Sequence, residues 1–311
     1  IITILILLTS ILLSYKKIVV IFKWLALSLF SYIFATFTIQ QDWLQILYHA
    51  FVPQIVWSKD FFIVLTAFMG TTISPYLFFW QANQEVEEKI IEQCKPGHIC
   101  HLRPATQEEL VTLKEDTRIG MSFSNVITFF IIALTGSVLF NAGTGGVETI
   151  QSAAEVLRPL AGDYAYVLFS LGIISAGLLA IPILAGSSAY VLSEIFNWGG
   201  SLDKPFSKAK EFYLVIVVSV LIGLTIPYFG ISPIQALLWT SIIHGIIAPF
   251  LIATLLHMAN NPAIVGPNVN KKGANFMGYF TLFIMSLAAL VFLALELPLE
   301  KIFASLLRTF I

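Results

Sequence analysis

Long apolar segments separated by polar ones constrain this chain more than any other feature. There are eight, and all but the first are at least eighteen residues long: 1–14, 18–40, 60–84, 121–140, 164–195, 212–229, 234–257 and 277–297. A helix needs about 20 apolar residues to cross the hydrocarbon core of a bilayer. We therefore predict an all-α polytopic membrane protein with about eight transmembrane helices and the lipid bilayer as a partner.

The composition excludes several other classes of protein. Only 11% of the residues are charged, against about 25% in soluble domains. The net charge of −1 gives no reason to expect a nucleic-acid partner. The sequence contains no glycine-rich phosphate loop, nucleophile elbow or His-Glu-x-x-His zinc motif, so we expect neither an enzyme nor a permanently bound cofactor.

The distribution of basic residues supports the eight segments. If Lys16 and Lys17 are cytoplasmic, thirteen of the seventeen Lys and Arg residues fall on the cytoplasmic side of alternate segments. An excess of Lys and Arg in cytoplasmic loops is the general rule for such proteins. We expect an integral protein of a bacterial-type plasma (inner) membrane. The oligomeric state is not predictable from the sequence.

The first segment, 1–14, is shorter than a span, and its basic residues Lys16 and Lys17 follow the apolar run. A signal peptide has the opposite order. We therefore expect the chain to be an N-terminally truncated fragment, and its 311 residues to form a single transmembrane transport domain.

The longest polar stretch, 85–118, is predicted to be a cytoplasmic loop. It contains four potential metal ligands within eight residues, Cys94, His98, Cys100 and His101. Their spacing matches no common zinc motif. An ordinary solvated loop and a metal-binding loop therefore both stay open.

The segment that begins at Asp60 is predicted to be a broken helix. Pro75 supplies no backbone N–H, and it disfavours helical geometry at Ser74. Gly70 is a weak helix former, so unwinding is expected from about 70 to 75. Phe61 lies ten residues before Thr71, or about 15 Å of helix, which places the break near the middle of a roughly 30 Å core.

Irregular backbone at this depth is tolerated only inside protein or beside a watery cavity. Many transporters build cation sites from such breaks. We therefore predict that the Thr71 carbonyl, Thr72 and Ser74 form part of a metal site made of hard oxygen donors. A proline kink packed by neighbouring helices is the alternative.

The same region resembles the sixth helix of the NRAMP family of divalent metal transporters. The resemblance rests on the run Gly70-Thr-Thr-Ile-Ser-Pro-Tyr76, followed by Trp80-Gln81. Arg118–Asn125, Leu171–Gly177 and Ala248-Pro249-Phe250 are similar to parts of the seventh, eighth and tenth helices. The resemblance implies a fragment of a LeuT-type fold, with eight of eleven helices, that transports divalent metal cations such as Mg²⁺, Mn²⁺ or Fe²⁺.

Four positions depart from the family pattern. The family's methionine before the proline is Ser74 here, and its two histidines are Tyr76 and Gln81. A glutamine of the tenth helix falls on Ser241. Oxygen donors suit Mg²⁺ or Mn²⁺ better than a thioether does, so the pattern is closest to the NRAMP-related magnesium transporter branch. The acidic ligand of the family's first helix, in an Asp-Pro-Gly motif, does not occur in this chain.

Two further residues are candidates for a supporting or pathway role. His244 is an ionisable group within an apolar segment, which marks a functional site by default. A neutral histidine bonded between helices is the alternative. The resemblance implies that Asn125 positions the unwound backbone.

Two other functions remain open on sequence grounds. One is an amino-acid permease of the same fold, in which the helix break binds a carboxylate through backbone amides. The other is a membrane sensor or scaffold without transport activity. Coupling to protons stays open.

Overall fold

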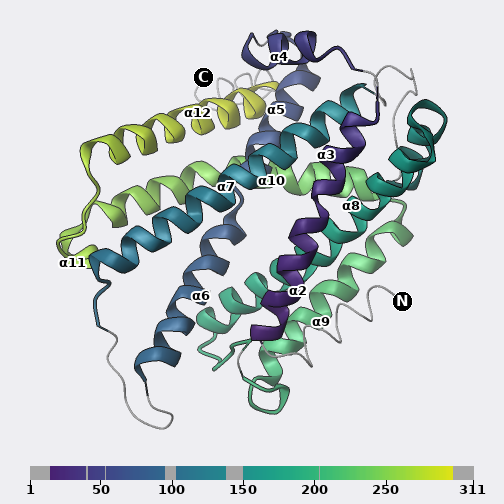
Figure 1. The fold of residues 1–311 in the computed structure, drawn as a ribbon. Coiled ribbons are helices and arrows are strands. Elements are labelled where there is room, and N and C mark those ends of the chain that lie inside the picture. The colour runs from purple at the N-terminus through teal and green to yellow at the C-terminus, as the bar shows by residue number, and fades with distance from the viewer. Residues whose placement is uncertain are drawn as a thin grey trace, which may run out of the picture. The chain divides into compact units, whose positions relative to one another are not determined.

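The computed structural model describes residues 15–39, 41–52, 54–94, 103–137, 150–202 and 204–296. Within these ranges every regular element is helical (Figure 1). The α-helices are α2 (Tyr15–Ser28), α3 (Phe30–Phe37), α4 (Trp43–Phe51), α5 (Lys59–Thr72), α6 (Pro75–Gln93), α7 (Gln107–Thr135), α8 (Ile150–Ile195), α9 (Lys210–Thr225), α10 (Pro233–Ala259), α11 (Pro262–Val265) and α12 (Lys272–Glu296). Two 3-10 turns, η2 (Phe206–Lys208) and η3 (Ile226–Phe229), flank α9.

Six stretches in the described ranges are long and apolar enough to cross a membrane: Val20–Phe37, Gln107–Thr135, Gly162–Ile195, Lys210–Phe229, Pro233–Ala259 and Lys272–Glu296. Each corresponds to one of the eight predicted segments. Two predicted segments remain. The segment 60–84 is divided between α5 and α6, and the segment 1–14 lies outside the described residues. Between 17% and 28% of each apolar window is buried within the chain.

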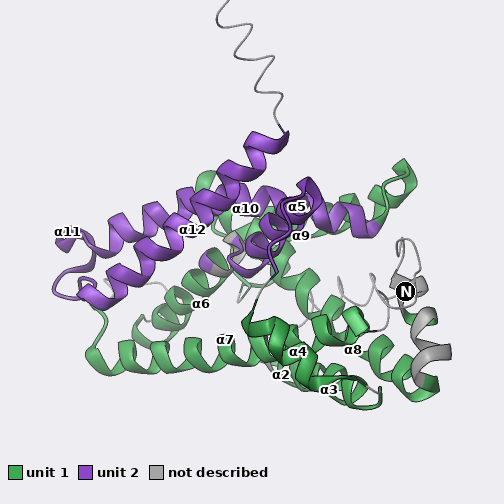
Figure 2. Ribbon diagram, turned by 90° about the horizontal axis from the view of Figure 1, so that it is seen from above, with its two compact units in different colours: residues 1–52, 79–232 green, residues 53–78, 233–311 purple. Residues whose placement is uncertain are grey.

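The chain divides into two compact units, coloured separately in Figure 2. Unit 1 contains Ile1–Val52 and Phe79–Ser232, and unit 2 contains Pro53–Phe78 and Pro233–Ile311. The boundary at Phe78 falls just after the start of α6. The single transport domain expected from the sequence stays a prediction.

Unit 1 is held together by two apolar clusters. In the first, α3, α7 and α8 bury Tyr32, Leu134 and Phe169. In the second, α8 and α9 pack around Tyr190, Phe212 and Tyr213. Aromatic rings meet edge-on in both clusters, for example Tyr190 and Phe212 with ring centroids 4.9 Å apart. Such edge-to-face pairs stabilise the packing beyond the burial of their apolar area.

Unit 2 is built on α10, which packs against both α5 and α12. Ala248, Ile252, Leu256 and Met285 form one buried cluster of α10 and α12. Ile73, the residue that follows α5, also packs against this cluster. The end of α5 is therefore anchored by apolar contacts within its own unit.

Side-chain caps fix where two of the helices begin. Ser58 accepts a hydrogen bond from Phe61 N at 3.2 Å and starts α5. Thr106 and Glu109 form a capping box at the start of α7, in which each side chain accepts from the other residue's backbone amide. Most of the polar stretch 85–118 is therefore helical, because α6 continues to Gln93 and α7 begins at Gln107.

A glycine divides the longest helix, α8. Gly162 has φ +81° and ψ 174° within the range Ile150–Ile195, a conformation that residues with a side chain rarely adopt. The helix therefore consists of a short first part and a longer part that contains the span Gly162–Ile195.

Candidate metal site at the helix break

The helix predicted to be broken is discontinuous in the structure. Helix α5 ends at Thr72, Ile73 leaves helical geometry with φ −113° and ψ 70°, and α6 begins at Pro75. The predicted break is confirmed, but its predicted start at Gly70 is wrong. Gly70, Thr71 and Thr72 remain helical because α10 packs along this part of α5, and Pro75 is favourable at a first helical position.

The break removes hydrogen-bond donors from carbonyls at the end of α5. The helical partner of the Gly70 carbonyl would be Ser74 N, and no such bond occurs among the backbone bonds of the described residues. The partner of the Thr71 carbonyl would be residue 75, which is proline and has no N–H. Both carbonyls lie at the negative end of the α5 dipole, which favours a cation.

The three predicted ligand side chains differ in their surroundings. The hydroxyls of Thr71 and Thr72 both donate to the Phe68 carbonyl, at 2.8 and 2.9 Å, and both residues are exposed. Ser74 is only 2% exposed. Each threonine oxygen retains lone pairs for a cation, but Ser74 is the position enclosed by protein.

The backbones of α10 and α5 are in direct contact beside the break. A Cβ atom at Gly70 would lie 2.1 Å from Ser241 O and 2.4 Å from Gly245 N. A Cβ at Gly245 would lie 2.5 Å from Thr66 O. Only glycine fits these positions without separating the helices, so the pair Gly70–Gly245 brings the middle of α10 to the break.

The same contact brings a third freed carbonyl to this region. Pro249 lies inside α10, and its missing N–H leaves the Gly245 carbonyl without a helical donor. Sequence reasoning did not identify Gly245 as a candidate site residue. The sequence does contain a signal for it: a proline follows Gly245 by four residues, just as Pro75 follows Thr71 by four.

Ser241 and His244 lie on this part of α10. Ser241 is 9% exposed, and its hydroxyl donates to the Leu237 carbonyl at 2.6 Å. Its carbonyl is the atom nearest to a Cβ built at Gly70. His244 is half-buried and directly precedes Gly245. The structure thus brings Ser241 to the break, while the roles assigned to both side chains stay predictions.

Of the other predicted support residues, two belong to unit 1, and the side chain of the third is not described. Gln81 donates through Nε2 to Thr117 Oγ1 at 3.3 Å. Asn125 is exposed on α7. The side chain of Tyr76 lies outside the described residues. The predicted roles of these three residues stay predictions.

The oxygen donors at the break are neutral. Among the described residues, no group of three or more His, Cys, Asp or Glu side chains is placed to hold a metal ion. In the loop after α6, Cys94 is disulfide-bonded and so offers no thiolate to a metal. His98, Cys100 and His101 lie outside the described residues.

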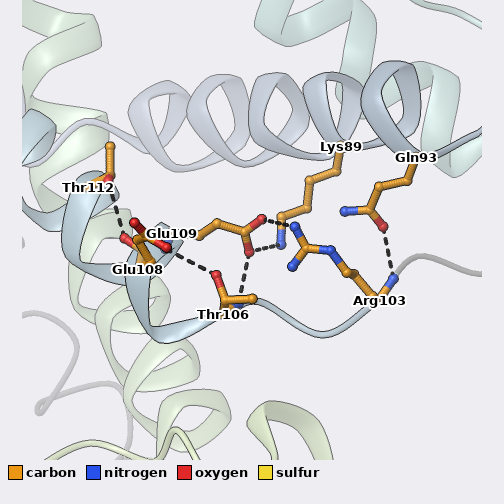
Figure 3. A network of polar contacts seen from close by, with 7 residues as sticks. All are labelled: Lys89, Gln93, Arg103, Thr106, Glu108, Glu109 and Thr112. Atoms are coloured by element: carbon orange, nitrogen blue, oxygen red, sulfur yellow. Dashed lines mark hydrogen bonds and ion pairs between the residues drawn. The ribbon is translucent and has the colours of Figure 1, made fainter.

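The far end of α6 is joined to α7 by a polar network centred on Glu109 (Figure 3). The Glu109 carboxylate accepts from Arg103 at 2.6 Å, from Lys89 at 3.3 Å and from Thr106 N at 2.8 Å. Arg103 N in turn donates to the Gln93 side chain at 3.0 Å. One carboxylate therefore connects α6, the start of α7 and the segment before it.

Replacing this carboxylate should lower stability slightly. We expect Glu109→Gln to reduce the melting temperature, because the amide loses the charge that attracts Lys89 and Arg103. In about 1 M salt, where the Debye length is about 3 Å, the difference from the wild type should shrink. Glu108→Gln is the matched control, since it removes a neighbouring exposed carboxylate outside this network. Equal effects of the two variants would contradict the assignment.

Together these features define a class of protein. Several apolar helices of spanning length, combined with one helix that is interrupted beside freed carbonyls, are typical of helical secondary transporters. The sequence profile of the Nramp family (natural resistance-associated macrophage protein-like) matches residues 1–295. The chain belongs to this family.

Curated relatives are similar at low identity. The divalent metal cation transporter MntH of Caldanaerobacter subterraneus subsp. tengcongensis is 23% identical over 244 residues, which are 78% of this chain and 52% of that protein. MntH of Clostridium acetobutylicum is 21% identical, with 80% and 53% coverage, and MntH of Brucella suis is 23% identical, with 84% and 53%. The chain spans about half the length of these relatives.

Family membership decides two expectations from the sequence. A member of this transporter family is not an enzyme, as expected. The family also implies the LeuT-type fold that the sequence resemblance suggested.

Proposed function

We propose that the full-length protein is a secondary transporter that moves a divalent metal cation across a bacterial plasma membrane by alternating access. The observation that carries this proposal is the interruption of α5 and α6 at Ile73 and Ser74, beside the carbonyls of Gly70, Thr71 and Gly245. Neutral carbonyls at a helix break coordinate cations in transporters of this kind. The MntH relatives carry the name of divalent metal cation transporters, which supports the same substrate class.

Within that class we propose a preference for hard cations, Mg²⁺ or Mn²⁺. Ser74 and Thr72 offer hydroxyl oxygens, and the freed groups are carbonyl oxygens. Such ligands suit Mg²⁺ and Mn²⁺, while soft sulfur ligands select other metals. This makes the magnesium transporter branch of the family the best match for the residues present.

The test changes the softness of one buried ligand. Cysteine is close to serine in size, whereas a methionine is too large for a position that is 2% exposed. We expect Ser74→Cys to raise uptake of Cd²⁺ relative to Mg²⁺ by about tenfold, the ratio that about 1.4 kcal/mol of differential binding produces. Uptake is measured with the full-length protein in proteoliposomes.

Ser74→Ala is the matched variant, because it removes the oxygen without adding sulfur. It should weaken uptake of all divalent cations without a gain for Cd²⁺. Unchanged metal preference in Ser74→Cys would remove Ser74 from the site. Uptake of amino acids instead of cations would favour the permease, and no uptake of either would favour the sensor or scaffold.

A further inference from the structure

The short helix α4 presents an apolar face outside the clusters that hold unit 1 together. Its members are spaced at i, i+3, i+4 and i+7, so they form one stripe along the helix, and all are exposed: Leu44, Leu47, Tyr48 and Phe51. Leu44 and Phe51 are 82% and 83% exposed. No residue of α4 is buried within the part of the chain that the structure describes. Adjoining exposed apolar side chains of this kind mark an interaction surface.

The remaining residues of α4 form two further faces. At 3.6 residues per turn, Trp43 and Ile46 lie on one of these faces, and both are half-buried. Gln45 and His49 lie on the other, and both are exposed polar residues. The three faces are about 120° apart. This is the arrangement of a helix that lies along the surface of a bilayer beside protein, with one side each for protein, lipid and water.

Contacts within unit 1 place the start of α4 at the boundary of the membrane. The Trp43 ring packs against Phe37, the last residue of the candidate span Val20–Phe37, with ring centroids 5.1 Å apart. The same ring contacts Phe130 of the candidate span Gln107–Thr135, with centroids 6.3 Å apart. Helix α4 therefore begins at a depth close to the ends of two spans.

The surroundings of α4 favour lipid as the partner of its apolar face. Gln41 Nε2 donates to the Thr36 carbonyl at 3.2 Å, which holds the connection between the span and α4. The span exposes further apolar side chains at this end, since Phe34 and Phe37 are 60% and 62% exposed. The segment 41–58 contains no Lys or Arg, so it has no basic charge to attract an acidic partner, and it falls on the predicted extracytoplasmic side.

We propose that α4 lies along the extracytoplasmic surface of the bilayer, with its apolar face inserted between the lipid acyl chains. Amphipathic helices of this kind bury their apolar side about 5–10 Å into the boundary between headgroups and acyl chains. Tyr48 suits that depth, because tyrosine is enriched where membrane meets water. Gln45 and His49 then face the water. The helix holds unit 1 at a fixed depth where the chain leaves it towards α5.

Spin labels measure the depth of each face. Single cysteines are introduced into the full-length protein by Leu44→Cys, Tyr48→Cys or Phe51→Cys, and each variant is labelled in liposomes of phosphatidylethanolamine and phosphatidylglycerol. The protein without an introduced cysteine supplies the background signal. Collisions of the label with oxygen, which concentrates in lipid, are compared with collisions with a neutral, water-soluble nickel chelate. We expect oxygen to prevail at all three positions, at a depth of about 5–10 Å.

Gln45→Cys and His49→Cys are the matched controls, because they place the same label on the polar face of the same helix. Collisions with the nickel chelate should prevail at both positions. All five labelled positions are exposed, so these substitutions should leave the melting temperature unchanged.

Two results would overturn the proposal. If the nickel chelate prevails on both faces, α4 projects into water. If the labels on the apolar face collide rarely with either reagent, protein covers that face, either another part of the full-length chain or a second copy. Neither result depends on cation uptake, so the test is independent of the proposed transport function.

Discussion

Gly70→Ala should destabilise unit 2 and abolish most transport. The new methyl group would lie 2.1 Å from the Ser241 carbonyl and 2.4 Å from Gly245 N, and both atoms belong to helix backbone that no rotamer change can move. Overpacking of this kind costs about 1–3 kcal/mol, and the better helix propensity of alanine returns at most about 1 kcal/mol. The melting temperature of the full-length protein in detergent measures the first effect, and cation uptake measures the second.

Gly177→Ala is the control for helix propensity alone. Gly177 also lies inside a helix, α8, but a Cβ there meets no atom within 4 Å. This variant should keep or slightly raise the melting temperature, with uptake unchanged. If Gly70→Ala behaves in the same way, α5 and α10 are not in backbone contact beside the break, and Gly245 has no place in the site.

The spans were predictable because one physical quantity determines them. Apolar length alone marks a helix that crosses a bilayer, and six predicted segments have a matching span. The break was also predictable, because Pro75 removes a donor whatever surrounds it. These features depend on a few neighbouring residues, which a single sequence displays in full.

The contact that completes the site was not predictable in the same way. Gly70 and Gly245 are far apart in the chain, and nothing in either neighbourhood indicates that they meet. Such contacts follow from tertiary packing, on which local propensity gives no information.

Two elements were missed although a local signal was present. The sequence Thr106-Gln-Glu-Glu109 has the spacing of a capping box, and it marks the start of α7 inside the stretch predicted to be a loop. Asp42 accepts a hydrogen bond from Gln45 N at 3.1 Å and caps α4, a nine-residue helix too short to register as a span. A hydropathy pattern indicates only segments long and apolar enough to lie in lipid. It therefore does not indicate short helices or the polar ends of long ones.

Pro75→Ala should reduce cation uptake by up to about a hundredfold. Alanine restores an N–H at position 75, which allows the Thr71 carbonyl to regain its helical hydrogen bond and α5 to join α6. A proline inside a helix costs about 3 kcal/mol, and each 1.4 kcal/mol is about a tenfold change in an equilibrium constant. The continuous helix therefore gains about a hundredfold in population relative to the broken one, and the carbonyls proposed to bind the cation are lost. Uptake in proteoliposomes is the measurement.

Pro233→Ala separates this effect from the removal of a proline in general. Pro233 also occupies the first position of a helix, α10, but Gly230 precedes it with φ +79°, so no continuous helix can form across that point. Uptake should stay at the wild-type level in Pro233→Ala. Hydrogen exchange at Ile73 and Ser74 provides the structural readout: in Pro75→Ala their amides should become protected as the helix closes. Protected amides with undiminished uptake would mean that the cation does not need the freed carbonyls, and the site would have to lie elsewhere.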